Sequence, residues 1–231
     1  YSSHAGRNIK SAAKPKTVPQ RFFYEIRVFL QNQAEKPGSS IAIVGKTGAG
    51  KTTLLKMVCG LTPLSTGELG LFGRSSSGSL EKSRSSIGSM IETPGFFPYL
   101  SARDNLEYYR IQRGCSDRSV VDGALRVVGL DKAGGKKFKN FSLGMKQRLG
   151  LALAVMGNPE LLVLDEPING LDQMGIKEFR DIILKMNRER RTTVLISSHI
   201  LGELSQIATI YGFIKKGRLI EHITAEELKE K

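Results

Sequence analysis

The run from Gly45 to Thr53, Gly-Lys-Thr-Gly-Ala-Gly-Lys-Thr-Thr, constrains the fold of this chain more than any other segment. It fits the spacing G-x-x-x-x-G-K-[ST], in which glycines let successive backbone N–H groups turn inward around a phosphate. The apolar, β-branched run 40–44 before it predicts a strand, and the run 54–59 after it predicts a helix whose N-terminus faces the phosphates. The order of strand, loop and helix predicts a nucleotide-binding loop within an α/β fold.

Each residue type in this loop has a task on a bound triphosphate. The glycines allow tight, positive-φ turns. Lys51 can reach the β- and γ-phosphates, and the Thr52 hydroxyl can bind Mg²⁺. We expect the nucleotide to be held by the whole loop, namely Gly45, Lys46, Thr47, Gly48, Ala49, Gly50, Lys51, Thr52 and Thr53.

The composition is that of a globular chain. Of the 231 residues, 40% are apolar and 25% are charged. The sequence has no uninterrupted run of about 18 apolar residues, the length that crosses a membrane, and no apolar leader. Cys59 and Cys115 lack metal-ligand spacing, so we expect two small apolar side chains in a reducing cytosol.

The net charge of +13 favours an anionic partner, either nucleic acid or an anionic membrane surface. Part of the excess lies at the start of the chain, where residues 1–24 hold no acid. The basic residues there are Arg7, Lys10, Lys14, Lys16 and Arg21. We expect a loose basic arm over 1–20, which is either a solvated tail or a segment that lies on a membrane.

Strand and helix patterns alternate along the chain, which predicts an α/β fold around a mostly parallel sheet. The expected strands are 25–30, 40–44, 161–165, 192–197, 211–214 and 218–221, and the expected helices are 54–59, 104–112, 119–128, 144–156 and 177–190. The last two strands flank a turn and predict an antiparallel hairpin, while the Ser- and Gly-rich segment 74–84 predicts a loop. Because the strand signal fades between about 94 and 157, we expect an inserted α-helical subdomain there.

Two acids, Asp165 and Glu166, end the apolar run 161–165. A carboxylate at the tip of such a strand can lie beside the phosphate loop and hold Mg²⁺, which is the task we expect of Asp165. Glu166 can accept a proton from an attacking water. Many buried strands end in acids where they reach solvent, so the pair by itself is weak evidence for a site. The phosphate loop earlier in the chain is what makes the pair indicate one.

Three further motifs follow the order found in one known family. The segment 141–148, Phe-Ser-Leu-Gly-Met-Lys-Gln-Arg, resembles the signature motif of ABC-type ATPases, usually Leu-Ser-Gly-Gly-Gln. The segment 169–172, Asn-Gly-Leu-Asp, is similar to the family's D-loop, with Asp172 at its end. His199 stands where the family has a switch histidine. Leu143 and Met145 depart from the usual Gly and Gln.

The resemblance implies a fold, a cofactor and a mechanism. It covers residues from about 36 to the end and implies an ABC-type nucleotide-binding domain over 21–231, with a core of about 21–92 and 158–231 and a helical subdomain of about 93–157. In this family two such domains clamp ATP and Mg²⁺ head to tail. Each ATP meets one protomer's phosphate loop and its partner's signature, here Ser142, Leu143, Gly144 and Met145. Catalysis would fall to Lys51, Glu166 and His199.

Glu92 departs from the family pattern, because it stands where most members have a Gln. A carboxylate there could bind Mg²⁺ more directly than an amide, or it could point to solvent. The run Ile-Glu-Thr-Pro-Gly-Phe-Phe-Pro at 91–98 resembles the branch that serves lantibiotic and bacteriocin immunity and bacitracin resistance. Members of that branch power the export of peptide antibiotics.

Aromatic residues occupy two places where the family makes contacts. Phe22 lies at the expected distance before the phosphate loop for stacking on adenine, and packing in the core is the alternative. Residues 92–105, including Phe96 and Phe97, would line the groove that receives a helix of a membrane permease, and packing within the helical subdomain is again the alternative.

The expected function is therefore that of an ATPase subunit at the inner face of the plasma membrane, bound to a separate permease and dimerising with nucleotide. The rival within the same family is a soluble ATPase that acts on DNA or ribosomes, for which the positive charge is suggestive. The sequence has one phosphate loop, no sustained heptads and no Cys pair, whereas such proteins carry tandem domains, long coiled coils or zinc modules. A GTPase or small-molecule kinase would leave the signature segment unexplained. We therefore expect no nucleic-acid partner.

Overall fold

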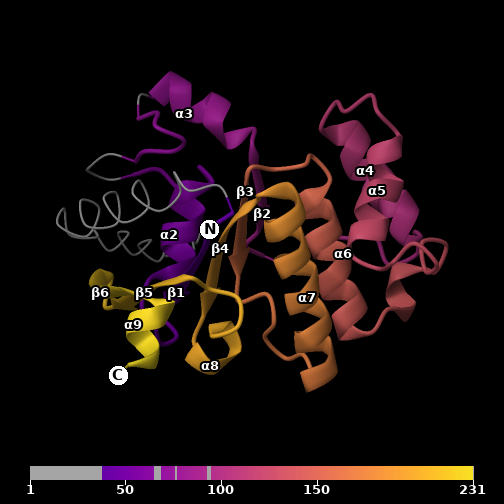
Figure 1. Cartoon of the computed structure of the whole chain (residues 1–231). Helices are drawn as coiled ribbons and strands as arrows, with labels where there is room; N and C mark the ends of the chain where they lie inside the picture. The colour runs from indigo at the N-terminus through magenta and orange to yellow at the C-terminus, as the bar shows by residue number, and fades with distance from the viewer. Residues whose placement is uncertain (1–37, 65–68, 76, 93–94, 231) are drawn as a thin grey trace, which may run out of the picture.

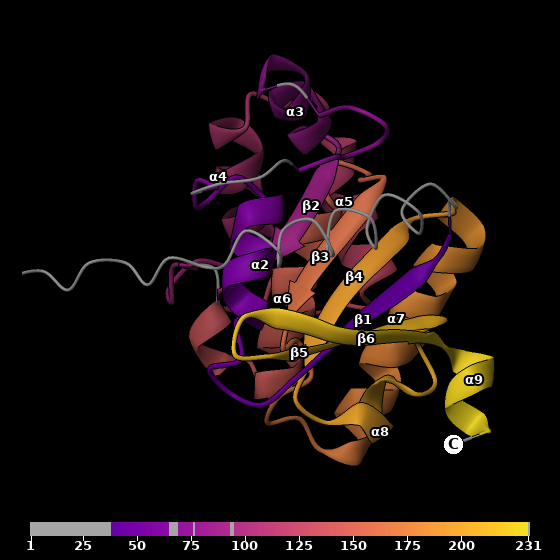
Figure 2. The ribbon, with the colours of Figure 1, turned by 90° about the vertical axis from the view of Figure 1, so that its left-hand side faces the viewer.

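The computed structural model describes residues 38–64, 69–75, 77–92 and 95–230. The expected strand 25–30 and Phe22 lie outside the described residues. Within them the sheet has the order β2-β3-β4-β1-β5-β6. The strands are β1 (Ser40–Val44), β2 (Ile87–Met90), β3 (Leu161–Asp165), β4 (Thr193–Ser198), β5 (Ile210–Lys215) and β6 (Arg218–Thr224). All neighbouring pairs are parallel except β5 and β6, so the expected α/β fold with an antiparallel hairpin is confirmed. Figure 2 shows β2, β3 and β4 side by side.

Helices cover both faces of the sheet, as Figure 1 shows for α2 on one side and α6 and α7 on the other. They are α2 (Lys51–Val58), α3 (Ser77–Arg84), α4 (Ala102–Gln112), α5 (Ser119–Val127), α6 (Leu143–Val155), α7 (Gln173–Arg190), α8 (Leu201–Leu204) and α9 (Ala225–Lys229), with a 3-10 turn, η1, at Phe138–Asn140. Strand β1 is buried along its whole length. Ile41 and Ile43 pack with α2, while Ala42 and Val44 pack with the opposite core. This two-sided burial explains why the strands are continuous apolar runs.

The helical segment α4–α6 lies to one side of the sheet, with α4 and α5 beyond α6 (Figure 1). Helix α6 contacts β2, α4 and α5. All its residues from Leu149 to Val155 are buried, because sheet and helices enclose it. The described residues of 95–157 form helices and no strand, as the sequence predicts. The division of the chain into a core and an inserted subdomain stays a prediction.

The segment 74–84 is not the loop that the sequence predicts, because α3 occupies Ser77–Arg84. Its composition of Ser, Gly and charged residues favours a helix only weakly. Tertiary contacts override that preference: Leu80 is buried in the core beside α2, and the Arg84 guanidinium donates to the backbone oxygens of Met57 and Val58. The short strand β2 is likewise not expected from the sequence. It becomes a strand by pairing with β3.

Candidate functional site

The phosphate loop joins β1 to α2, and its backbone has the shape that the glycines were expected to allow. Gly48 and Gly50 have φ of 78° and 109°, values that favour glycine. Gly45 is needed for space instead, since a Cβ there would lie 2.4 Å from the oxygen of Ile214. Lys46, Thr47, Thr52 and Thr53 are exposed around the loop, while Ala49 is buried beneath it.

The carboxyl ends of β1, β3 and β4 meet at one edge of the sheet, because these strands are parallel neighbours. The phosphate loop follows β1, Asp165 ends β3 with Glu166 next to it, and His199 follows β4. Residues from three distant segments thus reach one place, which is where α/β sheets bind ligands.

Lys51, Glu166 and His199 form a connected chain of polar contacts. The Lys51 Nζ lies 3.1 Å from Glu166 Oε1, and it also donates to the oxygen of Gly45 at 2.6 Å. The other oxygen of Glu166 lies 2.8 Å from His199 Nδ1, so that nitrogen carries the proton in this contact. Each oxygen of Glu166 therefore has a separate partner.

The pKa of Glu166 is held below its ordinary value by these partners. Burial by itself would raise the pKa of this carboxyl. The hydrogen bond from His199 and the hydrogen bond and charge of Lys51 together outweigh burial. Glu166 is consequently a carboxylate whose basicity depends on where Lys51 lies.

Asp165 is also held on both oxygens. The Thr52 hydroxyl donates to Asp165 Oδ2 at 2.6 Å, and the Ser197 hydroxyl donates to Oδ1 at 2.5 Å. One hydroxyl and one carboxylate are oxygen donors of the kind that Mg²⁺ prefers, and phosphates and water commonly complete its shell. The residues present therefore fit a nucleotide-bound Mg²⁺. Among the described residues no group of three or more His, Cys, Asp or Glu could hold a metal without such help.

A cavity of about 320 Å³ lies over this edge of the sheet. Its lining comes from the phosphate loop, α2 and the segments after β3 and β4: Thr47, Gly48, Gly50, Lys51, Thr52, Thr53, Glu166, Asn169 and His199. Most of these residues are expected from the sequence. The motifs assign no role of its own to Asn169 or to Ser197, and only the D-loop motif offered a signal for Asn169.

The signature residues lie at the start of α6 and do not belong to this cavity. Ser142 is the N-cap of α6, where its hydroxyl accepts from the N–H of Met145 at 3.3 Å. Leu143 is 48% exposed, and its Cδ2 lies 3.3 Å from where a Cβ on Gly170 would be. Gly144 is half-buried. Asp172 similarly caps α7 by accepting from the N–H of Gly175. The start of the signature helix and the D-loop are thus neighbours in one chain.

Glu92 lines a different cavity from the one that Thr52 lines, together with Lys56. Its carboxylate lies 2.6 Å from Lys56 Nζ on α2, and the Glu92 side chain is 74% exposed. The hydrogen bond and the charge of Lys56 hold the pKa of Glu92 below its ordinary value. The role of Glu92 in binding metal stays a prediction.

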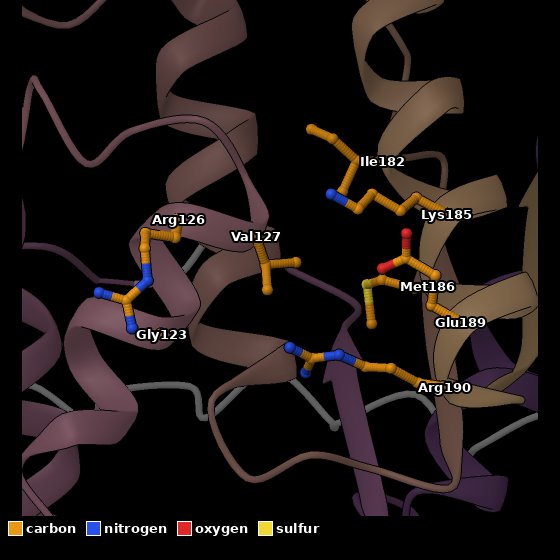
Figure 3. A pocket seen from close by; sticks show the side chains of 8 residues that line it. All are labelled: Gly123, Arg126, Val127, Ile182, Lys185, Met186, Glu189 and Arg190. Atoms are coloured by element: carbon orange, nitrogen blue, oxygen red, sulfur yellow. The ribbon is translucent and has the colours of Figure 1, made fainter.

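A second cavity, of about 240 Å³, lies between α5 and α7. Figure 3 shows Lys185, Met186 and Arg190 of α7 around Val127 of α5. Its other lining residues are Gly123, Arg126, Ile182 and Glu189. It contains none of the residues singled out for nucleotide chemistry.

The fold and the site define a P-loop nucleotide-binding protein, and the comparisons with known proteins name its family. The family model described as ABC transporter matches residues 32–169. The bacitracin transport ATP-binding protein BcrA of Enterococcus faecalis is 45% identical over 194 residues, 84% of this chain and 63% of that protein. The chain belongs to the ABC transporter family.

Two further relatives agree with this assignment. The lantibiotic transport ATP-binding protein SrtF of Streptococcus pyogenes is 41% identical over 196 residues, 84% of this chain and 83% of that protein. The solved structure of cbiO1 from Clostridium perfringens, part of the ABC transporter complex cbiONQ, matches with a TM-score of 0.75 at 27% identity, over 84% of this chain and 80% of that chain. The chain spans less than two thirds of the length of its BcrA relatives. None of its described helices is long and apolar enough to cross a membrane.

Proposed function

We propose that this chain binds and hydrolyses ATP with Mg²⁺ and thereby powers a separate membrane permease. The observation that carries the proposal is the chain of contacts from Lys51 through Glu166 to His199, beside a phosphate loop. These contacts support the proposal because Lys51, Glu166 and His199 line one cavity, as a phosphate-binding cation, a base and a histidine contact would require.

The Lys51 contacts suggest how binding prepares the base. In the structure Lys51 is divided between Glu166 and the backbone oxygen of Gly45. A triphosphate in the loop competes with Glu166 for the Lys51 ammonium. When the ammonium moves to the phosphates, the proton affinity of Glu166 rises. Glu166 then accepts a proton from water as the water attacks the γ-phosphorus, and ADP leaves.

His199 keeps one oxygen of Glu166 occupied, so that the other oxygen is directed to the water. Thr52 and Asp165 would hold Mg²⁺, which supplies neutralising charge to the phosphate oxygens. Glu92, which pairs with Lys56 in the structure, would be a further ligand of the metal.

The working form that we propose is a nucleotide-dependent dimer. The first N–H groups of α6 and the Ser142 hydroxyl form a helix N-terminus, the kind of element that binds phosphate. No described signature residue lines the chain's own nucleotide cavity. A second copy, or a related chain, can bring its signature to that cavity.

The permease contact that we propose uses the loop before α4. Phe96 is 7% exposed and packs against Tyr109 and Phe138, so it belongs to the core. Phe97 is 42% exposed and Tyr99 is 72% exposed. An exposed aromatic surface of this kind suits a helix of a membrane subunit and would place the chain at the inner face of the plasma membrane.

Export of a peptide antibiotic is the transport reaction that we propose. The names of the bacitracin and lantibiotic relatives support it. Resistance to bacitracin and to a lantibiotic, measured in cells that carry this chain with its permease, identifies which class is exported. If cells with and without the chain are equally sensitive to bacitracin, and also equally sensitive to the lantibiotic, the proposal is contradicted.

The ATPase assignment is tested by Glu166→Gln. The variant should bind a fluorescent ATP analogue as the parent does, while phosphate release falls by about 10²–10⁴-fold, the usual contribution of a general base. Glu81→Gln, at an exposed position on α3, is the matched control and should retain the parent rate. Parent-like hydrolysis by Glu166→Gln would remove the assigned base.

A further inference from the structure

Ser197 contacts both acids of the site, although neither the motifs nor the comparisons assign it a role. It lies on β4 directly opposite Asp165 in the parallel register, and it is fully buried. Its hydroxyl donates to Asp165 Oδ1 at 2.5 Å and accepts from the backbone N–H of Glu166 at 3.0 Å. One buried oxygen thus bridges the expected metal ligand and the expected base.

The backbone of Glu166 needs such support. Its φ of 47° lies in the left-handed region, which is unfavourable for a residue with a side chain. Residues in this region persist where the surroundings hold them, and they gather at functional sites. The Glu166 N–H donates to two oxygens of Ser197, the hydroxyl at 3.0 Å and the backbone oxygen at 3.2 Å. Ser197 therefore holds the turn that aims the Glu166 side chain at Lys51 and His199.

The same hydroxyl determines which oxygen of Asp165 faces the phosphate loop. With Oδ1 bonded to Ser197, Oδ2 is the oxygen directed to Thr52. If Thr52 turns its hydroxyl to another ligand, the carboxylate still cannot rotate without breaking the bond to Ser197. A fixed carboxylate binds a metal better than a rotating one because its orientation is already set.

We propose that Ser197 is a positioning residue of the ATPase site, which orients Asp165 for the metal and Glu166 for proton transfer through one hydroxyl. The inference rests on the proposed function for its catalytic consequence. Its structural content, a hydroxyl that holds the Glu166 amide, does not depend on hydrolysis.

Ser198 provides a matched control in the adjacent position. It is also fully buried, but successive strand side chains point to opposite faces. Its hydroxyl accepts from the N–H of Ile200 and lies 3.3 Å from Glu203 Oε2, so its contacts lie toward α8. Ser198→Ala removes the same atom from the same strand without touching either acid.

The test compares Ser197→Ala with Ser198→Ala on three measurements. Ser197→Ala should lower kcat by about 10–100-fold, the usual effect of losing the partner of a metal ligand. ATP affinity in EDTA should stay at the parent value, while the gain in affinity on adding Mg²⁺ shrinks. Amide hydrogen exchange at Glu166, measured without nucleotide, should become faster. Ser198→Ala should reproduce the parent in all three.

Ser197→Thr retains the hydroxyl and should restore the Mg²⁺-dependent gain in affinity. A thermal melt reveals whether steric crowding unfolds that variant. If it does, the comparison of Ser197→Ala with Ser198→Ala still tests the positioning role of Ser197. An unchanged Mg²⁺-dependent gain together with unchanged exchange at Glu166 in Ser197→Ala overturns the inference. If the parent itself does not hydrolyse ATP, the proposed function fails, and the exchange at Glu166 tests the positioning separately.

Discussion

The nucleotide edge of the sheet and the start of α6 contain equally specific motifs. They differ in how many of their side chains find polar partners in other segments of the same chain. At the edge, Lys51, Glu166 and Asp165 all contact partners from other segments of the same chain. At the start of α6, the Ser142 hydroxyl accepts from the N–H of Met145 within its own first turn, and Leu143 is half exposed.

The difference shows which part of the chemistry one chain can organise alone. The acids and the lysine are preorganised by the strand order, since three parallel strands end beside one another. The first turn of the signature helix does not line the described nucleotide cavity, so in the proposed dimer its ligand is the nucleotide held by a second chain.

Ser142→Ala should lower ATP hydrolysis by about 100-fold, the effect of removing one donor to a transition-state oxygen. ATP binding by the single chain should be unchanged, because Ser142 is not part of its own cavity. Ser101→Ala is the matched control: Ser101 caps α4 as Ser142 caps α6, so both variants lose a cap worth about 1 kcal/mol. Only Ser142→Ala should affect hydrolysis.

Mixing Ser142→Ala with Lys51→Ala makes the contrast sharper. A mixed dimer pairs an intact phosphate loop from the first variant with an intact signature from the second. On mixing, the hydrolysis rate should rise above the low rate of either variant alone. Failure to recover any activity would mean that the site is complete within one chain.

Phe97→Asp should weaken co-purification with the permease by roughly tenfold or more, the loss typical of a central aromatic contact. The Phe97 side chain is 42% exposed. The Asn105 side chain holds the loop by hydrogen bonds to the backbone N–H and oxygen of Phe97, which the substitution retains, so the fold should survive. Ile220→Asp on β6, at a position that is 60% exposed, is the control. Undiminished co-purification of Phe97→Asp with an unchanged ATPase rate would exclude this loop as the docking surface.

The smallest effect concerns the stability of the nucleotide edge itself. Because the folded pKa of Glu166 lies below its ordinary 4.5, the ionised carboxylate stabilises the fold above that pH, and the stabilisation is lost as pH falls through the folded value. Glu166→Gln should therefore melt at a lower temperature than the parent at pH 7, because the amide lacks the charge that Lys51 and His199 contact. The difference in melting temperature between the variant and the parent should disappear as the pH falls below 4.5. A difference in melting temperature that stays constant with pH would mean that the ion pair adds no stability.

Much of the fold could be predicted from local patterns, and the exceptions have physical causes. The strands of the parallel sheet are buried on both faces, so β1 and β3 appear as continuous apolar runs. Strand β2 and helix α3 carry no such pattern, and contacts with β3 and α2 stabilise them. Phe96 and Phe97 are adjacent and chemically alike, yet one is buried and the other is exposed, which no local pattern could decide.

The sequence by itself determined the phosphate loop, the two acids after an apolar strand and the order of the family motifs. These features are encoded in contiguous residues, because a backbone cradle and a strand end are local structures. Only the tertiary structure decided that Ser197 bridges Asp165 and Glu166 and that Glu92 pairs with Lys56. Such contacts depend on which strands become neighbours and on how helices pack against them, and the spacing of residues along one chain does not specify either.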